Sequence, residues 1–238
     1  MLRHHSNTHR LSLTAQKGFT VIEVLIATVI FSVLLLIITY GVMSFTNDYY
    51  KGVNSSTAQN TARSVVDAVS QAIQFGGVPV SQPMSGGLPC HGSTTCTFCI
   101  NSKQFDFTLY KEVGTAPGQI SDALWESPLN QVGGASCSSV AAGPNSQSLI
   151  GPHMRLQKFT ITPGASGTNT YYIDVEVVYG DDDLLCDTNL SGDCDSNSVS
   201  PHLTSPTANI ACKLHAGSQY CYVANLSTAI QMRVQPVL

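Results

Sequence analysis

The first part of the chain carries a long apolar run without a charged residue. Residues 24–47 contain no charged side chain. As a helix this stretch would span about 36 Å, which is enough to cross the hydrocarbon core of a bilayer. It is longer than the apolar region of a secretory signal peptide, and no Ala-x-Ala-like site follows it. We therefore expect the helix to be retained as a membrane anchor.

A different apolar pattern follows, in which small and branched residues recur every three or four positions. These positions are Ala58, Ala62, Val65, Val69 and Ala72/Ile73. The spacing predicts an amphipathic helix packed on a core. Gly76-Gly77 and then Pro79 predict its end, so one helix over residues 19–75 would be about 85 Å long.

Beyond the helix, the chain alternates between turn-rich stretches and segments with apolar residues at every second place. Residues 76–102 are rich in Gly, Pro, Ser and Cys and predict a loop. The alternating segments are residues 104–109, 154–162, 170–179 and 226–234. Period-two segments separated by turns predict an antiparallel sheet with one face on the helix. The expected fold class is α+β: a long N-terminal helix, membrane-spanning in its first half and amphipathic in its second, packed on a β-sheet head.

Charge indicates how the chain is oriented across a membrane. Residues 1–18 contain Arg3, Arg10 and Lys17 but no acid, whereas the remainder is net acidic. A basic stub before an apolar run places the N-terminus in the cytoplasm and the head outside. Only 11% of residues are charged, and no basic stripe that would indicate nucleic-acid binding is evident.

The junction between the basic stub and the apolar run holds the most informative residues. The sequence there is Lys17-Gly18-Phe19-Thr20-Val21-Ile22-Glu23. A carboxylate is costly in an apolar helix, so Glu23 is a functional candidate whose partner should be positive. Because glycine has no side chain, a protease can approach the backbone closely at Gly18.

This string, followed by the long apolar stretch, resembles the N-terminus of the type IV pilin family, which includes the pseudopilins of type II secretion systems. The resemblance implies that prepilin peptidase removes residues 1–18 by cleavage between Gly18 and Phe19. The same enzyme would methylate Phe19, and Glu23 would become the fifth mature residue. A neighbouring subunit's Glu23 could then neutralise the new α-amine of Phe19 and direct assembly.

The resemblance further divides the chain into a leader (1–18), a transmembrane and polymerisation half-helix (19–46), an amphipathic half-helix (47–76) and an extracytoplasmic head (77–238). The layout is similar to PilW-like minor pilins and GspJ-like pseudopilins with large β-rich heads. It implies a non-enzymatic subunit in the cytoplasmic membrane that is assembled into, or at the tip of, a surface filament. The implied partners are other pilin subunits, prepilin peptidase and the inner-membrane assembly platform. Many major pilins carry a proline where this chain has Tyr40, so no proline kink is expected.

Two functions of other classes remain open. A membrane-tethered extracytoplasmic binding module, calcium-dependent or adhesive, would use the helix only as an anchor. A tethered thiol enzyme would use Cys96-x-x-Cys99, but the predicted loop around it lacks the βαβ context of such enzymes. No nucleophile elbow or phosphate loop is evident.

The cysteines predict disulfides. All eight lie in the part expected outside the cytoplasm, where the compartment is oxidising: Cys90, Cys96, Cys99, Cys137, Cys186, Cys194, Cys212 and Cys221. We expect Cys137 to pair within the first group. The last four allow three pairings, and Cys212–Cys221 is the shortest tie between the last loop and the final strand. Cys90, Cys96 and Cys99 with His91 also suggest zinc, although a second Cys-x-x-Cys is missing.

An acidic stretch partly matches a calcium loop. Positions 1, 3, 5, 6, 7 and 9 of an EF-hand-type loop fall on Asp187, Asn189, Ser191, Gly192, Asp193 and Asp195. Position 12 is Ser198 and not the usual bidentate Glu. The resemblance adds that some pseudopilins hold calcium near the C-terminus, so Ca²⁺ is a possible ligand. The alternative is a solvated acidic loop held by disulfides.

Overall fold

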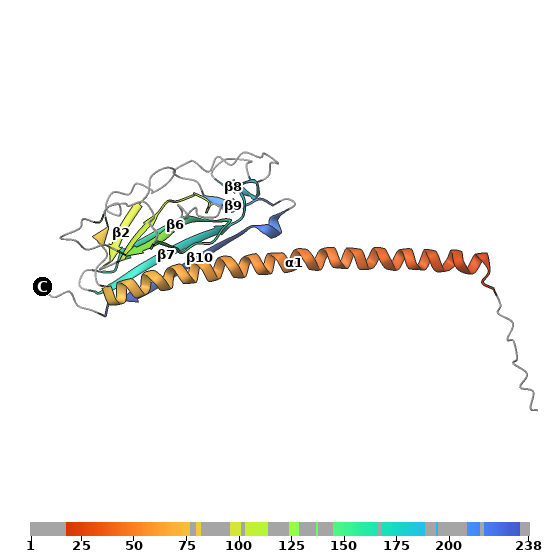
Figure 1. Ribbon diagram of the computed structural model, residues 1–238, viewed down its shortest axis with the longest axis horizontal. Coiled ribbons are helices and arrows are strands. Elements are labelled where there is room, and N and C mark those ends of the chain that lie inside the picture. The colour runs from red at the N-terminus through yellow and green to blue at the C-terminus, as the bar shows by residue number, and fades with distance from the viewer. Residues whose placement is uncertain are drawn as a thin grey trace, which may run out of the picture. The chain divides into compact units, whose positions relative to one another are not determined.

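The structure is a computed structural model, and it describes residues 18–76, 80–81, 96–100, 103–113, 124–128, 137, 145–165, 168–188, 194, 209–214 and 217–233. The chain divides into two compact units, residues 1–46 and residues 47–238, here called the N-terminal unit and the C-terminal unit. Helix α1 (Val21–Gly76) supplies residues to both units and is labelled in Figure 1. It continues through Tyr40 and Gly41 without interruption.

In the N-terminal unit, α1 is apolar on every side and its described side chains are exposed. Its most apolar 18-residue window has a mean hydropathy of 3.0, so length and composition allow it to cross a membrane. Its hydroxyl groups donate to carbonyl oxygens one turn earlier, as in Ser32 to Thr28 (2.7 Å) and Thr39 to Leu35 (2.8 Å). Both hydroxyl protons are therefore paired within the helix, as a segment surrounded by lipid requires.

In the C-terminal unit, α1 buries one stripe. The buried positions are Asn54, Ala58, Ala62, Val65, Val66, Val69, Ala72 and Ile73. They belong to the main hydrophobic core together with residues of two sheets. The predicted apolar stripe and the α+β fold class are therefore confirmed.

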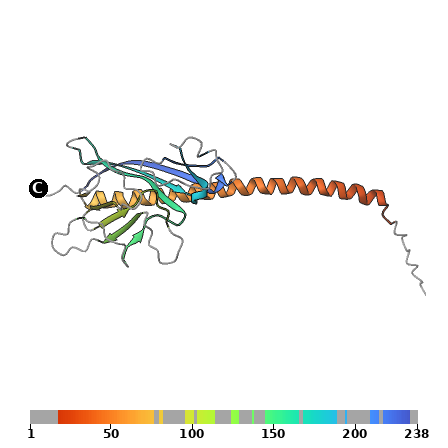
Figure 2. The ribbon, with the colours of Figure 1, turned by 90° about the horizontal axis from the view of Figure 1, so that it is seen from above.

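Two larger antiparallel sheets cover the second half of α1. The five-stranded sheet has the order β1 (Val80–Ser81), β2 (Cys96–Ile100), β3 (Lys103–Phe107), β4 (Leu124–Pro128), β5 (Gln147–Ser148). The three-stranded sheet has the order β10 (Tyr222–Gln231), β7 (Thr170–Tyr179), β6 (Met154–Pro163). A small sheet pairs β8 (Leu185–Asp187) with β9 (Ile210–Cys212). Figure 2 shows the first two side by side over the helix.

Phenylalanines from both large sheets meet in the core. Phe98 of β2 stacks on Phe105 of β3 with ring centroids 4.8 Å apart, and Phe159 of β6 lies 5.4 Å from Phe98. Phe107 meets Phe159 edge-on at 5.1 Å. Such pairs stabilise by about 0.5–1.5 kcal/mol beyond their area burial. The cluster therefore joins the two sheets into one core.

The strand predictions succeed where apolar and polar residues alternate along the strand. The segment predicted at 170–179 is β7, with Ile173, Val175 and Val177 fully buried. The one predicted at 154–162 is β6, and those at 104–109 and 226–234 overlap β3 and β10 with shifted ends.

The prediction of a loop over residues 76–102 is wrong in two places, because β1 occupies Val80–Ser81 and β2 occupies Cys96–Ile100. All five β2 residues are buried, so the segment shows no apolar–polar alternation. Strand β4 was likewise not predicted. In a strand, positions three apart face opposite sides, so Cys96 and Cys99 do not face each other as in a thioredoxin-like dithiol. Cys99 instead bonds Cys137.

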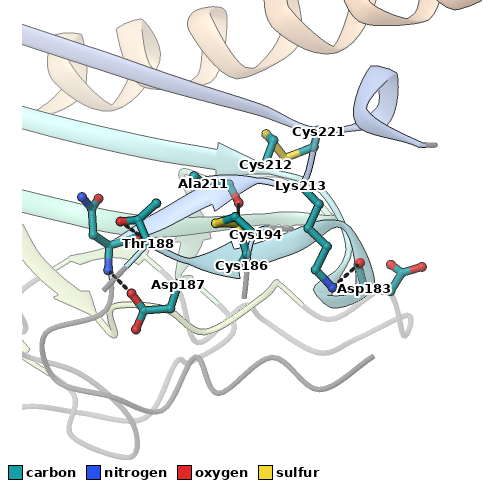
Figure 3. Close-up of a disulfide and its surroundings, with 10 residues drawn as sticks. Asp183, Cys186, Asp187, Thr188, Cys194, Ala211, Cys212, Lys213 and Cys221 are labelled. Carbon is teal, nitrogen blue, oxygen red and sulfur yellow. Dashed lines mark hydrogen bonds between the residues drawn. A yellow bond between two sulfur atoms is a disulfide. The ribbon is translucent and has the colours of Figure 1, made fainter. Parts of the chain in front are cut away.

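Disulfides hold the loops of the head, as expected for its fold class. The described bonds are Cys99–Cys137, Cys186–Cys194 and Cys212–Cys221. Cys96 is also disulfide-bonded, while Cys90 and His91 lie outside the described residues. The Cys212–Cys221 bond ties β9 to the start of β10 and lies beside Cys186–Cys194 (Figure 3).

Candidate processing and assembly site

The first turn of α1 is closed by a reciprocal pair of side chains. The backbone N–H of Thr20 donates to Glu23 Oε2 at 2.8 Å, and the Thr20 hydroxyl donates to the same oxygen at 3.0 Å. Thr20 Oγ1 lies 3.3 Å from the backbone nitrogen of Glu23. Thr20 is the residue before the helix and Glu23 is its third residue, so together they form a capping box. Helix initiation thus fixes where the carboxylate lies.

Only one oxygen of that carboxylate is used by the cap. Both hydrogen bonds from Thr20 end on Oε2, and among the described residues Oε1 accepts none. A negative charge in the first turn is also stabilised by the helix dipole. The cap therefore holds Glu23 in a defined orientation while leaving an oxygen open to a cation from outside the chain.

A shallow hollow lies on the same face of the helix. It is lined by Phe19, Glu23, Val24, Ala27, Thr28 and Phe31. The small Ala27 leaves space between the aromatic rings of Phe19 and Phe31, which are separated by about three helical turns. Phe19 is 88% exposed. The arrangement places an open carboxylate oxygen beside a hollow that another apolar helix could enter.

The proposed cleavage point is also exposed. Gly18 precedes the helix, and a side chain added there would meet no atom within 4 Å. The peptide bond between Gly18 and Phe19 is therefore sterically open to a protease. Sequence analysis singled out Gly18, Phe19 and Glu23 but missed Thr20. The Thr-x-x-Glu spacing, which is a capping-box signature, was the available signal.

The calcium hypothesis falls mostly outside the described part of the chain. Of its five candidate ligands, Asn189, Ser191, Asp193 and Asp195 lie outside the described residues. Asp187 is buried in β8, and its Oδ1 accepts a hydrogen bond from the Asn209 backbone at 3.0 Å (Figure 3). One oxygen of this side chain is thus already used in holding two chain segments together.

The C-terminal disulfide region is docked on α1 within the C-terminal unit. The Asn54 side chain donates to the Gln219 carbonyl at 2.9 Å, in the short helix η3 (Ser218–Tyr220). The Tyr50 and Tyr220 rings lie 5.3 Å apart. The Cys212–Cys221 bond, which encloses η3, is therefore connected to the helix through both polar and aromatic contacts.

Comparison with known families supports the interpretation of the N-terminus as a prepilin-type methylation motif. Residues 13–39 match the family model of the prokaryotic N-terminal methylation motif. No curated protein and no solved structure gave a significant match. The chain thus carries a type IV pilin-like prepilin N-terminus, in which the methylation motif leads into an apolar helix. That motif implies processing by prepilin peptidase and pilus-like assembly.

Proposed function

We propose that this protein is a minor pilin or pseudopilin, a structural subunit built into or at the tip of a type IV pilus-like filament. The observation that carries the proposal is the geometry of Glu23: a carboxylate held by Thr20 in the first turn of an exposed apolar helix, with Oε1 open. A simple membrane anchor has no need of such a group, because a charge in an apolar segment is costly.

Processing would create the partner of this carboxylate. Hydrolysis of the Gly18–Phe19 peptide bond leaves a carboxylate on Gly18 and a protonated α-amine on Phe19. A methyl donor used by the peptidase would then give up one methyl group to this nitrogen, which releases one proton in exchange. The amine keeps its positive charge after methylation. The attraction between the two charges grows as packing of the helices excludes water from between them. The pair would therefore select one stagger between neighbouring helices.

The apolar hollow supports the same assembly. Neighbouring helices could enter the space between Phe19 and Phe31, beside Glu23. The second half of α1 takes no part in this contact because its apolar stripe is already buried in the core. Anchoring and polymerisation would thus use residues 19–46, while residues 47–76 seat the head. The head would face the medium, with the Cys212–Cys221 region exposed on the filament.

Two substitutions separate assembly from helix capping. Glu23→Gln keeps a carbonyl oxygen for the Thr20 donors but removes the charge. Thr20→Val removes the hydroxyl and keeps the charge. We expect both variants to be inserted and cleaved. Glu23→Gln alone should fall at least about tenfold in the sheared filament fraction relative to the membrane pool, because it removes the charge that pairs with the neighbouring α-amine.

Quantitative immunoblotting of both fractions provides the measurement, with Glu126→Gln as a matched control in the head. Incorporation of Glu23→Gln at the wild-type level would contradict the proposal and favour a tethered binding module that does not polymerise. Equal loss in Glu23→Gln and Thr20→Val would contradict the expected difference, because assembly would then depend on the whole first turn of the helix and not on the charge alone.

A further inference from the structure

Three side chains with metal-binding atoms converge on one edge of the C-terminal unit. Glu112 follows β3, His153 immediately precedes β6, and Asp181 lies between β7 and the short helix η2 (Asp182–Leu184). His153 Nδ1 lies 2.6 Å from Asp181 Oδ1 and 3.6 Å from Glu112 Oε1. All three ligand atoms lie within 4.8 Å of one another. We propose that Glu112, His153 and Asp181 form a three-ligand Zn²⁺ site.

The distances suit tetrahedral zinc. Zinc bonds to imidazole nitrogen and carboxylate oxygen are about 2.0–2.2 Å long, which places neighbouring ligand atoms about 3.4 Å apart. The observed separations lie on both sides of that value, so small side-chain rotations would bring all three atoms to bonding distance. The metal would replace the hydrogen bond between His153 and Asp181. An imidazole ligand favours zinc over calcium or magnesium, which prefer oxygen ligands alone.

A buried arginine orients both carboxylate-bearing segments. The Arg155 side chain is 1% exposed. Its Nη2 donates to Glu112 Oε2 at 3.0 Å and to the Gly180 carbonyl at 3.1 Å, and Nη1 donates to Asp182. These bonds leave Glu112 Oε1 facing His153 and fix the turn that carries Asp181. Outer partners of this kind orient metal ligands and commonly change affinity by about 10–100-fold.

The charge of the cluster favours a divalent cation. The cluster holds three carboxylates, those of Glu112, Asp181 and Asp182, and one guanidinium, that of Arg155, so two negative charges remain when His153 is neutral. A Zn²⁺ ion would neutralise this excess.

The site would keep an open coordination position. The side chains of Glu112, His153 and Asp181 are 28%, 44% and 56% exposed, so water can complete the tetrahedron. This site shares no residue with the zinc hypothesis drawn from Cys90, Cys96, Cys99 and His91, and it does not depend on filament assembly. Its role would be to join the segment after β3, the start of β6 and the end of β7.

Direct zinc titration tests the site. The processed chain, purified untagged in detergent and freed of metal with a chelator, is titrated with Zn²⁺ by calorimetry. We expect one equivalent bound by the wild type, and at least tenfold weaker binding for His153→Ala and for Asp181→Asn. Asp183→Asn, two positions farther along the same acidic stretch, is the matched control and should bind like the wild type. Co²⁺ in place of Zn²⁺ should give the visible absorption of a tetrahedral site.

Thermal unfolding keeps the result interpretable if a variant is less stable. Zn²⁺ should raise the unfolding temperature of the wild type and of Asp183→Asn but not that of His153→Ala. Absence of stoichiometric binding, or equal Zn²⁺ affinity in wild type and His153→Ala, would overturn the proposal. The proposal would also be overturned if His153→Ala lowered the unfolding temperature by the same amount with and without Zn²⁺, because the cluster would then be an ion pair only.

Discussion

The two halves of helix α1 differ in how they use apolar residues. In the first half, isoleucines, leucines and valines point in every direction and remain exposed; Ile37, for example, is 63% exposed. In the second half, apolar residues lie on one stripe, and Ile73 is fully buried. An all-round apolar surface must be covered by lipid or by other helices, whereas a stripe can be covered by the chain's own sheets. One continuous helix thus serves two different environments.

Polar groups in the two halves follow the same division. Hydroxyls in both halves donate to carbonyls of the same helix, as in Thr46 to Val42 and Thr57 to Val53, both at 2.8 Å. Among the described residues, only the second half adds side-chain bonds to partners far away in sequence, such as that from Asn54 to Gln219. Local pairing is what a segment in lipid requires, because water is absent there. Long-range pairing requires a folded head beside the helix. The polar contacts therefore distinguish the two environments independently of the apolar pattern.

The largest stability effect we expect separates two isoleucines of the same helix. Ile73→Ala should lower the free energy of unfolding of the head by about 2–5 kcal/mol, because it leaves a cavity in the core. Ile37→Ala should change it by less than about 0.5 kcal/mol, because Ile37 contacts no core. Urea unfolding followed by fluorescence of Trp125, the single tryptophan and a buried residue, measures both. Equal effects of the two substitutions would refute the division of the helix.

A smaller effect concerns ionisation in the head. Glu176 of β7 is half-buried, and burial raises its pKa above the ordinary value of 4.5 although Lys158 opposes the shift. The folded state therefore binds this proton more tightly than the unfolded state does. The contribution of Glu176 to stability is greatest below pH 4.5 and is lost as pH rises through the folded-state pKa.

Removing this carboxylate should make the head less sensitive to pH. Glu176→Gln should raise the free energy of unfolding at pH 7 by a few tenths of a kcal/mol, since the residue is only partly buried. Its urea midpoint should also fall less steeply than that of the wild type between pH 4.5 and 7. A steeper pH dependence in Glu176→Gln would contradict the assigned direction of the shift.

The sequence predicted those parts of the fold in which apolar residues recur on one face of an element. Helix α1 and strand β7 could be located because apolar residues recur at 3.6 or two positions. Strand β2 could not, because Phe98 and Ile100 are buried on one face while Thr97 and Cys99 are buried on the other, with no charged or strongly polar residue to mark an alternation. It also follows a stretch rich in Gly, Pro and Ser. Periodicity carries no information where the residues on the two faces of a strand do not differ in polarity.

The two sites differ in the same way. Gly18, Phe19, Thr20 and Glu23 are neighbours in the chain, so spacing alone could locate the assembly site, including the capping role of Thr20. Glu112, His153 and Asp181 come from three separate segments and are brought together by the pairing of β6 with β7 and by the bridge from Glu112 to Arg155. No local spacing indicates such a cluster.

The most direct test of the account is the mass and N-terminal sequence of the mature protein purified from membranes. Intact-mass analysis with fragment-ion reading should show a chain that begins at Phe19 and carries one added methyl group. That result is predicted if the first half of α1 is a processed assembly element. A chain that retains residues 1–18, or is cut beyond Tyr40, would contradict it.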